Sequence, residues 1–154
     1  MAAPPKYRVF LDTSVLFAAV HSEKGGARLI LKLGEAGAIS IIVGPWVLQE
    51  AENVLTRKSP RSKPLFALLL QQANVEISPR ADEKTMEKAL NIIAYTPDAK
   101  VVAEAMMSDI DYFVSLDRKH LVGNPYAEKL PFPIGTPGDF LAWFREQMRE
   151  GQKG

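Results

Sequence analysis

Two hydrophobic periodicities alternate along the chain. Predominantly apolar runs, as expected for strands buried on both faces, occupy residues 7–11, 39–43 and 112–116. Residues 74–78 and 131–134 are weaker strand candidates, and the second is expected at a sheet edge because it contains two prolines. Elsewhere apolar residues recur every three or four positions, which predicts helices at residues 15–19, 27–34, 45–58, 65–72, 82–94, from 98 onward and 137–149. This alternation predicts an α/β fold with a central, mainly parallel sheet.

The size of the chain predicts one domain. Its 154 residues and 17.0 kDa suffice for a single hydrophobic core, so we expect one domain over residues 1–154, with an ordered part at about 6–149. The tail from Glu150 onward is expected to fray. Apolar residues make up 47% of the chain and charged residues 24%, as in ordinary globular proteins.

Cysteine content and charge narrow the environment but not the function. The chain has no cysteine, which excludes disulfides and thiolate zinc sites and suits a reducing cytoplasm. The first residues lack the apolar core of a signal peptide, and no apolar stretch approaches the roughly 20 residues that span a bilayer. We therefore expect a cytoplasmic protein with no membrane partner. A formal net charge of +1 neither indicates nor excludes binding to nucleic acid.

Two of the predicted strands end in an aspartate. Asp12 follows the first strand, and Asp117 follows the strand at residues 112–116. In a parallel sheet both would lie at the carboxyl edge, where open α/β sheets place their ligands. Carboxylates that meet in this way repel each other unless a cation lies between them. The pattern therefore predicts a metal site at this edge of the sheet.

Asp98 is a third acidic candidate. It shares a helical face with Val102 and Ala105, so a carboxylate opens a stripe that faces the core. The alternative interpretation is a helix N-cap, a position that aspartate suits well. The helix precedes the strand that ends in Asp117. We expect Asp98 to reach the acidic edge of the sheet only if the chain takes a non-standard return.

A glutamate in the helix at residues 45–58 is the fourth candidate. Glu50 and Glu52 lie at opposite edges of the apolar face of this helix, so periodicity does not choose between them. The alternative for Glu50 is a solvated helical side chain, as for most acidic residues. Asp109 and Asp111 are expected only to shape the loop before the following strand.

Four segments in order resemble the PIN-domain nucleases, which include VapC-like toxin ribonucleases. The first has the family's apolar-Asp-Thr-Ser-apolar motif, the second contains Glu50, the third is an aspartate that leads a helix toward an alanine, and the fourth is a strand that ends in Ser-x-Asp. These segments are residues 10–16, 45–55, 98–103 and 111–118. The resemblance covers about residues 7–122 of the chain.

The resemblance implies a three-layer α/β/α sandwich that gathers four acids into one catalytic pocket: Asp12, Glu50, Asp98 and Asp117. It thereby favours Glu50 over Glu52. In the family such pockets hold Mg²⁺ or Mn²⁺ and hydrolyse phosphodiesters, usually in RNA. Hard oxygen ligands suit these ions. We expect Asp12 and Asp117 to ligate the principal ion, with Asp98 joining directly or through water. Glu50 would position or deprotonate the attacking water, or support a second ion.

Residues around the fourth acid are candidates for contact with the substrate. Ser115 stands where threonine is commoner in the family and keeps a hydroxyl group. Arg118 and Lys119 follow Asp117 directly, a position from which they could hold an RNA backbone. Further basic residues at 57–63 are equally well explained as a solvated loop.

Several functions stay open at this point. A metal-dependent endoribonuclease could be the toxin of a toxin–antitoxin pair, with an antitoxin protein and a second copy of the chain as partners, or an RNA-processing enzyme. A catalytically silent domain that binds RNA or protein is the second class. A haloacid-dehalogenase-like phosphatase is less well supported, because Ser14 stands where a second aspartate is expected. The two histidines, His21 and His120, lack the His-x-x-x-His spacing of a zinc enzyme.

Overall fold

A five-stranded parallel sheet forms the centre of the protein. The computed structural model describes residues 6–153 and gives the strand order β3-β2-β1-β4-β5. The strands are β1 (Arg8–Leu11), β2 (Ser40–Val43), β3 (Glu76–Ile77), β4 (Tyr112–Val114) and β5 (Ile134–Gly135). Each pairs in parallel with its neighbours, as the alternating sequence pattern predicts.

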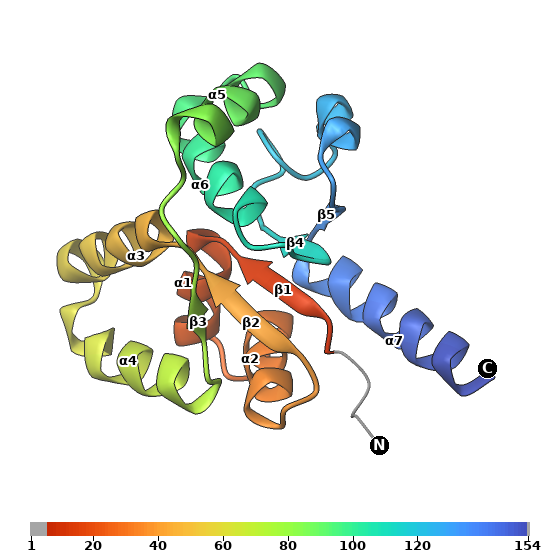
Figure 1. Ribbon diagram of the computed structural model, residues 1–154. Coiled ribbons are helices and arrows are strands. Elements are labelled where there is room, and N and C mark those ends of the chain that lie inside the picture. The colour runs from red at the N-terminus through yellow and green to blue at the C-terminus, as the bar shows by residue number, and fades with distance from the viewer. Residues whose placement is uncertain (1–5, 154) are drawn as a thin grey trace.

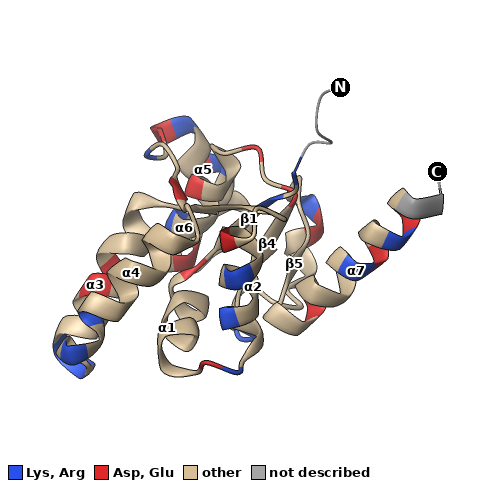
Figure 2. Ribbon diagram, turned by 90° about the horizontal axis from the view of Figure 1, so that it is seen from below, with Lys and Arg blue, Asp and Glu red and all other residues tan. Residues whose placement is uncertain are grey.

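Within residues 6–153, seven α-helices flank the sheet. They are α1 (Thr13–His21), α2 (Gly26–Glu35), α3 (Pro45–Lys58), α4 (Lys63–Gln72), α5 (Glu83–Ile92), α6 (Thr96–Met106) and α7 (Pro137–Lys153), with 3₁₀ turns at η1 (Pro60–Ser62) and η2 (Pro125–Lys129). Helices α1 and α2 lie on one side of the sheet, and the α5–α6 pair lies on the other (Figures 1 and 2). The expected α/β/α sandwich is therefore confirmed. None of these helices within residues 6–153 combines the length and the apolar character needed to cross a membrane.

The middle of the sheet is the core, and its register positions the acidic edge. Phe10 and Phe113 are fully buried, lie opposite each other on β1 and β4, and stack with ring centroids 5.2 Å apart. Because Leu11 pairs with Val114, β1 and β4 end side by side, and the residues that follow them are Asp12 and Ser115. The backbone N–H of Asp12 still donates to the carbonyl of Val114, at 3.3 Å. This last bond fixes where Asp12 stands relative to the end of β4.

Several element boundaries differ from the sequence predictions, and four of these differences have a clear description in the structure. Thr13 and Ser14, expected in a turn, are the first residues of α1, because Asp12 already caps that helix. β3 is shorter than residues 74–78, and Asn74 adopts a left-handed conformation with φ of 54°. β5 lies later than residues 131–134, since the two prolines there cannot donate to the sheet. Helix α7 continues to Lys153 and so includes residues 150–153, which the sequence predicts to fray.

Helix α3 begins beside a buried carboxylate from α6. Gly44 is the N-cap residue and has no side chain to cap the helix, but both carboxylate oxygens of Glu104 accept a hydrogen bond from the Trp46 backbone, at 3.1 and 3.0 Å. A Cβ atom at residue 44 would collide with Glu104, so glycine is required there. Burial raises the pKa of Glu104, which is 5% exposed. The contact ties α6, which carries Asp98, to the end of β2.

Replacing the carboxylate of Glu104 should weaken this junction. Glu104→Ala is expected to lower the free energy of unfolding by about 1–2 kcal/mol, the scale of a lost helix cap. Glu104→Gln keeps a carbonyl acceptor and is expected to lose less. Urea unfolding followed by circular dichroism measures both variants. An alanine variant as stable as the wild type would show that the bonds to Trp46 contribute nothing.

Candidate active site

Asp12 is a buried carboxylate held by two hydroxyl groups. It follows β1 in extended conformation and caps α1, accepting a hydrogen bond from the backbone of Val15 at 3.3 Å. Its Oδ1 accepts from Ser14 Oγ and its Oδ2 from Ser115 Oγ, each at 2.5 Å. Burial raises the pKa of Asp12, and these three hydrogen bonds oppose the rise. Asp12 therefore stands at the carboxyl end of the first strand, as the sequence predicts.

Ser115 connects Asp12 to the loop that carries Asp117. The side chain of Ser115 is completely buried, and its Oγ accepts a hydrogen bond from the backbone of Asp117 at 3.0 Å while it donates to Asp12. Ser14 does the same on the other side, since its Oγ accepts from the backbone of Leu116 at 3.1 Å. Ser115 therefore positions two acids in this structure. Its contact with a substrate stays a prediction.

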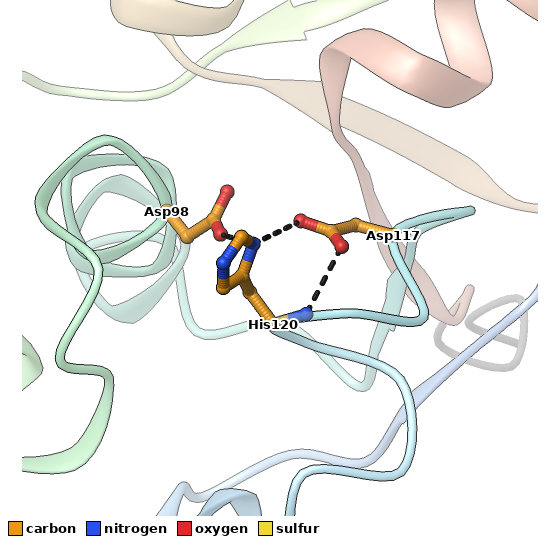
Figure 3. A group of neighbouring side chains, drawn as sticks. All are labelled: Asp98, Asp117 and His120. Atoms are coloured by element: carbon orange, nitrogen blue, oxygen red, sulfur yellow. Dashed lines mark hydrogen bonds and ion pairs between the residues drawn. The ribbon is translucent and has the colours of Figure 1, made fainter.

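Asp117 and Asp98 meet across the imidazole of His120 (Figure 3). The Nδ1 atom of His120 lies 3.2 Å from Asp98 Oδ2 and 3.4 Å from Asp117 Oδ2. Asp117 Oδ1 accepts hydrogen bonds from the backbones of Lys119 and His120, each at 3.0 Å. Each of the three side chains offers a ligand atom within 4.8 Å of the others, and all three are half-buried.

The interpretation of Asp98 as an N-cap is wrong. Tyr95 is the N-cap residue of α6, and Asp98 lies in the first turn, after Pro97. Its carboxylate is free to face the sheet edge, and its Oδ2 is buried without a hydrogen-bond partner. A buried carboxylate oxygen without a hydrogen bond destabilises the folded state unless a further group or ion binds to it.

The chain also needs no non-standard return to bring Asp98 to this edge. The start of α6 lies beside Asp117, at the carboxyl end of β4, while the carbonyl of Ser108, just after α6, accepts from Arg8 at the amino end of β1. Helix α6 therefore runs antiparallel to the strands, as a crossover helix normally does. The expectation of a non-standard return was wrong, because a helix that precedes a parallel strand and runs antiparallel to it already has its amino end at the carboxyl edge of the sheet.

The two facing carboxylates perturb each other. Burial, followed by the negative charge of Asp117, raises the pKa of Asp98 to about 7. Burial acts in the same direction on Asp117, but the hydrogen bonds it accepts outweigh it and lower its pKa. The negative charge of Asp12 also raises the pKa of Asp98, so the two carboxylates interact electrostatically. Without a cation, this edge of the sheet favours an added proton.

Glu50, like Asp12, lies outside the group formed by Asp98, Asp117 and His120. It is half-buried on α3 and forms no hydrogen bond or ion pair with any part of the chain between residues 6 and 153. Glu52, by contrast, is exposed. Asp109 and Asp111 shape the loop as expected, the first with φ of 50° and the second by accepting from the Arg8 backbone at 2.7 Å.

His120 is the residue that sequence reasoning missed. Its ring stacks on Tyr95, with centroids 4.2 Å apart and planes inclined by 10°. The sequence offers one weak signal, since His120 lies three residues after Asp117 and a turn could bring it back to that carboxylate. The sequence places His120 in the basic turn after Asp117 but assigns it no metal role, because the two histidines lack the spacing of a zinc site on one helix. In the structure His120 meets Asp98, which belongs to another element.

The donor set fits a divalent cation. Two carboxylates and an imidazole converge, one carboxylate oxygen is buried and lacks a hydrogen bond, and the mutual repulsion of the acids is what a cation would relieve. Arg118 and Lys119 are exposed next to these acids and line a hollow of about 540 Å³ that Tyr126 also borders. The arrangement can hold a cation beside a polyanion.

Comparison with known proteins agrees with the fold. The PIN domain family matches residues 9–122, which include all four predicted acids. Among solved structures, that of PAE2754 from Pyrobaculum aerophilum superposes with a TM-score of 0.57 and 15% identity, over 91% of this chain and 90% of that one. No curated protein matches the chain in sequence.

The raised pKa of Asp98 should make the metal-free protein less stable as pH rises. Its folded pKa of about 7 lies above its ordinary value of 3.8, so the folded state holds the proton more tightly and loses stability as pH rises from about 4 to about 7. Asp98→Asn should remove this loss. Urea unfolding in EDTA between about pH 5 and about pH 7.5 measures it, with an expected difference of at least about 1 kcal/mol.

The lowered pKa of Asp117 acts below this pH range and does not obscure the result. Saturating Mn²⁺ should also remove the loss in the wild type, because the cation takes the place of the proton. A metal-free wild type with the same pH dependence as Asp98→Asn would contradict the assigned repulsion.

Proposed function

Given that this chain belongs to the PIN domain family, we propose that it is a Mg²⁺- or Mn²⁺-dependent endoribonuclease that hydrolyses RNA phosphodiester bonds. PIN domains are generally metal-dependent nucleases. The observation that carries the proposal is the convergence of Asp98 and Asp117 at the carboxyl edge of the sheet, where both approach His120 Nδ1 and the buried Oδ2 of Asp98 lacks a hydrogen-bond partner. Such a pair is poorly explained as a structural feature, because the repulsion costs stability.

The acidic residues would divide the work between holding the cation and preparing the reaction. Asp98 and Asp117 would hold the ion. Asp12, which the sequence predicts as a further ligand, lies outside their group and has both oxygens hydrogen-bonded to Ser14 and Ser115, so it would contribute its negative charge. A bound divalent cation would offset the charge that develops on the phosphate and make water more acidic. Glu50, the remaining acid of the family pattern, would accept a proton from the attacking water or orient it.

Two basic side chains, those of Arg118 and Lys119, would hold the RNA backbone. Arg118 and Lys119 are exposed in the turn between Asp117 and His120, so their side chains are accessible to a polyanion. Cations that bind phosphates make affinity fall with added salt. We propose that these two residues hold the phosphates that flank the cleaved bond.

Cleavage of a mixed RNA pool by the purified protein tests the function. Mg²⁺ or Mn²⁺ should support cleavage and EDTA should abolish it. Asp117→Asn and Asp12→Asn should each reduce the rate by about a hundredfold or more, the scale of lost electrostatic stabilisation in a transition state. Glu50→Gln should reduce it as well, whereas the matched control Glu52→Gln, two residues away and exposed, should not.

The same assay separates binding from chemistry. Arg118→Ala with Lys119→Ala should raise KM and flatten its salt dependence with little change in kcat. Folded wild type that binds RNA without cleaving it, with metal present and any inhibitor removed, would favour a silent binding domain. Cleavage undiminished in Asp117→Asn would place the chemistry elsewhere.

For the cellular setting we propose the toxin of a toxin–antitoxin pair acting in the cytoplasm. The support is the family resemblance, and the partners would be RNA, an antitoxin protein and a second copy of the chain. Expression of wild type should then arrest growth, and Asp117→Asn should not. Coexpression with a neighbouring small open reading frame should restore growth and yield a complex. Normal growth with active wild-type enzyme would instead favour RNA processing.

A further inference from the structure

We propose that His120 is a ligand of the same cation, and that its imidazole makes the site prefer Mn²⁺ or Co²⁺ to Mg²⁺. The inference rests on the proposed function, because it assumes that Asp98 and Asp117 hold a divalent ion. It goes further by adding a nitrogen donor to a site otherwise built from carboxylates. A nitrogen donor changes which metal the site selects.

The distances around His120 suit three ligands on one face of a single ion. Metal–ligand bonds to these ions are about 2.1 Å long, so two ligands at right angles lie about 3 Å apart. The Nδ1 atom lies 3.2 Å from one oxygen of Asp98 and 3.4 Å from one oxygen of Asp117. The oxygen of Asp98 is the buried one that has no hydrogen-bond partner. Small movements would bring all three atoms onto one ion.

The ring of His120 is held in this orientation from two sides. Tyr95 stacks flat against it, and Tyr95 is the N-cap residue of the helix that carries Asp98. The backbone of His120 donates to Asp117 at 3.0 Å, and its carbonyl accepts from the side chain of Asn124 at 2.8 Å. In Figure 3 the Nδ1 atom faces the two carboxylates. A ring fixed in this way is prepared to bind without further ordering.

The chemistry of the donors sets the metal preference. Mg²⁺ prefers oxygen ligands and gives up water reluctantly, whereas imidazole favours the later divalent ions, whose affinity rises from Mn²⁺ to Co²⁺. An all-carboxylate site would show little of this difference. Tyr95 acts as a positioning residue, since it touches the ring and not the ion.

A different arrangement would give the opposite result. His120 could occupy the position of the ion and be displaced when the ion binds, because its Nδ1 lies between the two carboxylates. The ring would then compete with the metal, and removing it would tighten the binding of every divalent ion. The experiment must therefore detect the Mn–N bond directly as well as measure affinity.

The test uses Mn²⁺ bound to the full chain in the absence of RNA. Electron spin-echo envelope modulation should show ¹⁴N coupling in the wild type, and His120→Ala and His120→Asn should abolish it. His21→Ala, which removes the only other histidine, should leave it unchanged. By calorimetry, His120→Ala should raise Kd for Mn²⁺ and Co²⁺ by about tenfold or more and Kd for Mg²⁺ by a smaller factor.

Variants of Tyr95 test the positioning. Tyr95→Ala should weaken the preference for Co²⁺ over Mg²⁺, and Tyr95→Phe, which keeps the stacked ring, should restore it. Absence of ¹⁴N coupling in the wild type would overturn the proposal. Tighter binding of all three ions by His120→Ala would overturn it in favour of displacement.

These outcomes are separable from those of the nuclease assay. A protein that shows ¹⁴N coupling and cleaves no RNA would contradict the proposed function and leave His120 as a ligand. A protein that cleaves RNA with Mn²⁺ and shows no ¹⁴N coupling would support the proposed function and contradict the role of His120 as a ligand.

Discussion

Repulsion between carboxylates at the carboxyl edge of the sheet is the constraint on which the rest of this structure depends. A parallel sheet brings the carboxyl ends of β1 and β4 together, and both continue into acidic residues. Helix α6 adds Asp98 from the other side of the same edge. The result is a cluster whose charge is unfavourable by itself and favourable around a cation.

The surrounding structure keeps the acids in place at some expense. Two serine hydroxyls satisfy both oxygens of Asp12, and each also accepts a backbone bond from the loop after β4. The turn after Asp117 donates two backbone N–H groups to that carboxylate. Glu104 anchors the other face of α6 to the start of α3. The acids are therefore fixed before any ion binds, which is what a preorganised site requires.

The sequence predicts much of this because the deciding features are local. Strand type, strand ends and parallel pairing follow from hydrophobic periodicity, and they place Asp12 and Asp117 at one edge. The inward face of Asp98 also follows from helical spacing. The direction in which its helix runs along the sheet does not follow from periodicity, which predicts only the buried face of a helix. The direction follows from the geometry of crossover connections.

The parts that could not be predicted depend on contacts between distant elements. His120 reaches Asp98 from another segment, and the stack with Tyr95 joins residues 25 positions apart. No spacing rule encodes such a meeting. Glu50 shows the converse, because the family pattern groups it with the other acids while the structure leaves it half-buried and apart from them.

The most direct test of the account is a crystal structure of the protein with Mn²⁺, located by anomalous scattering. The account predicts an ion bonded to the carboxylates of Asp98 and Asp117. An ordered site with no ion between these two residues, at a Mn²⁺ concentration that supports RNA cleavage, would contradict it.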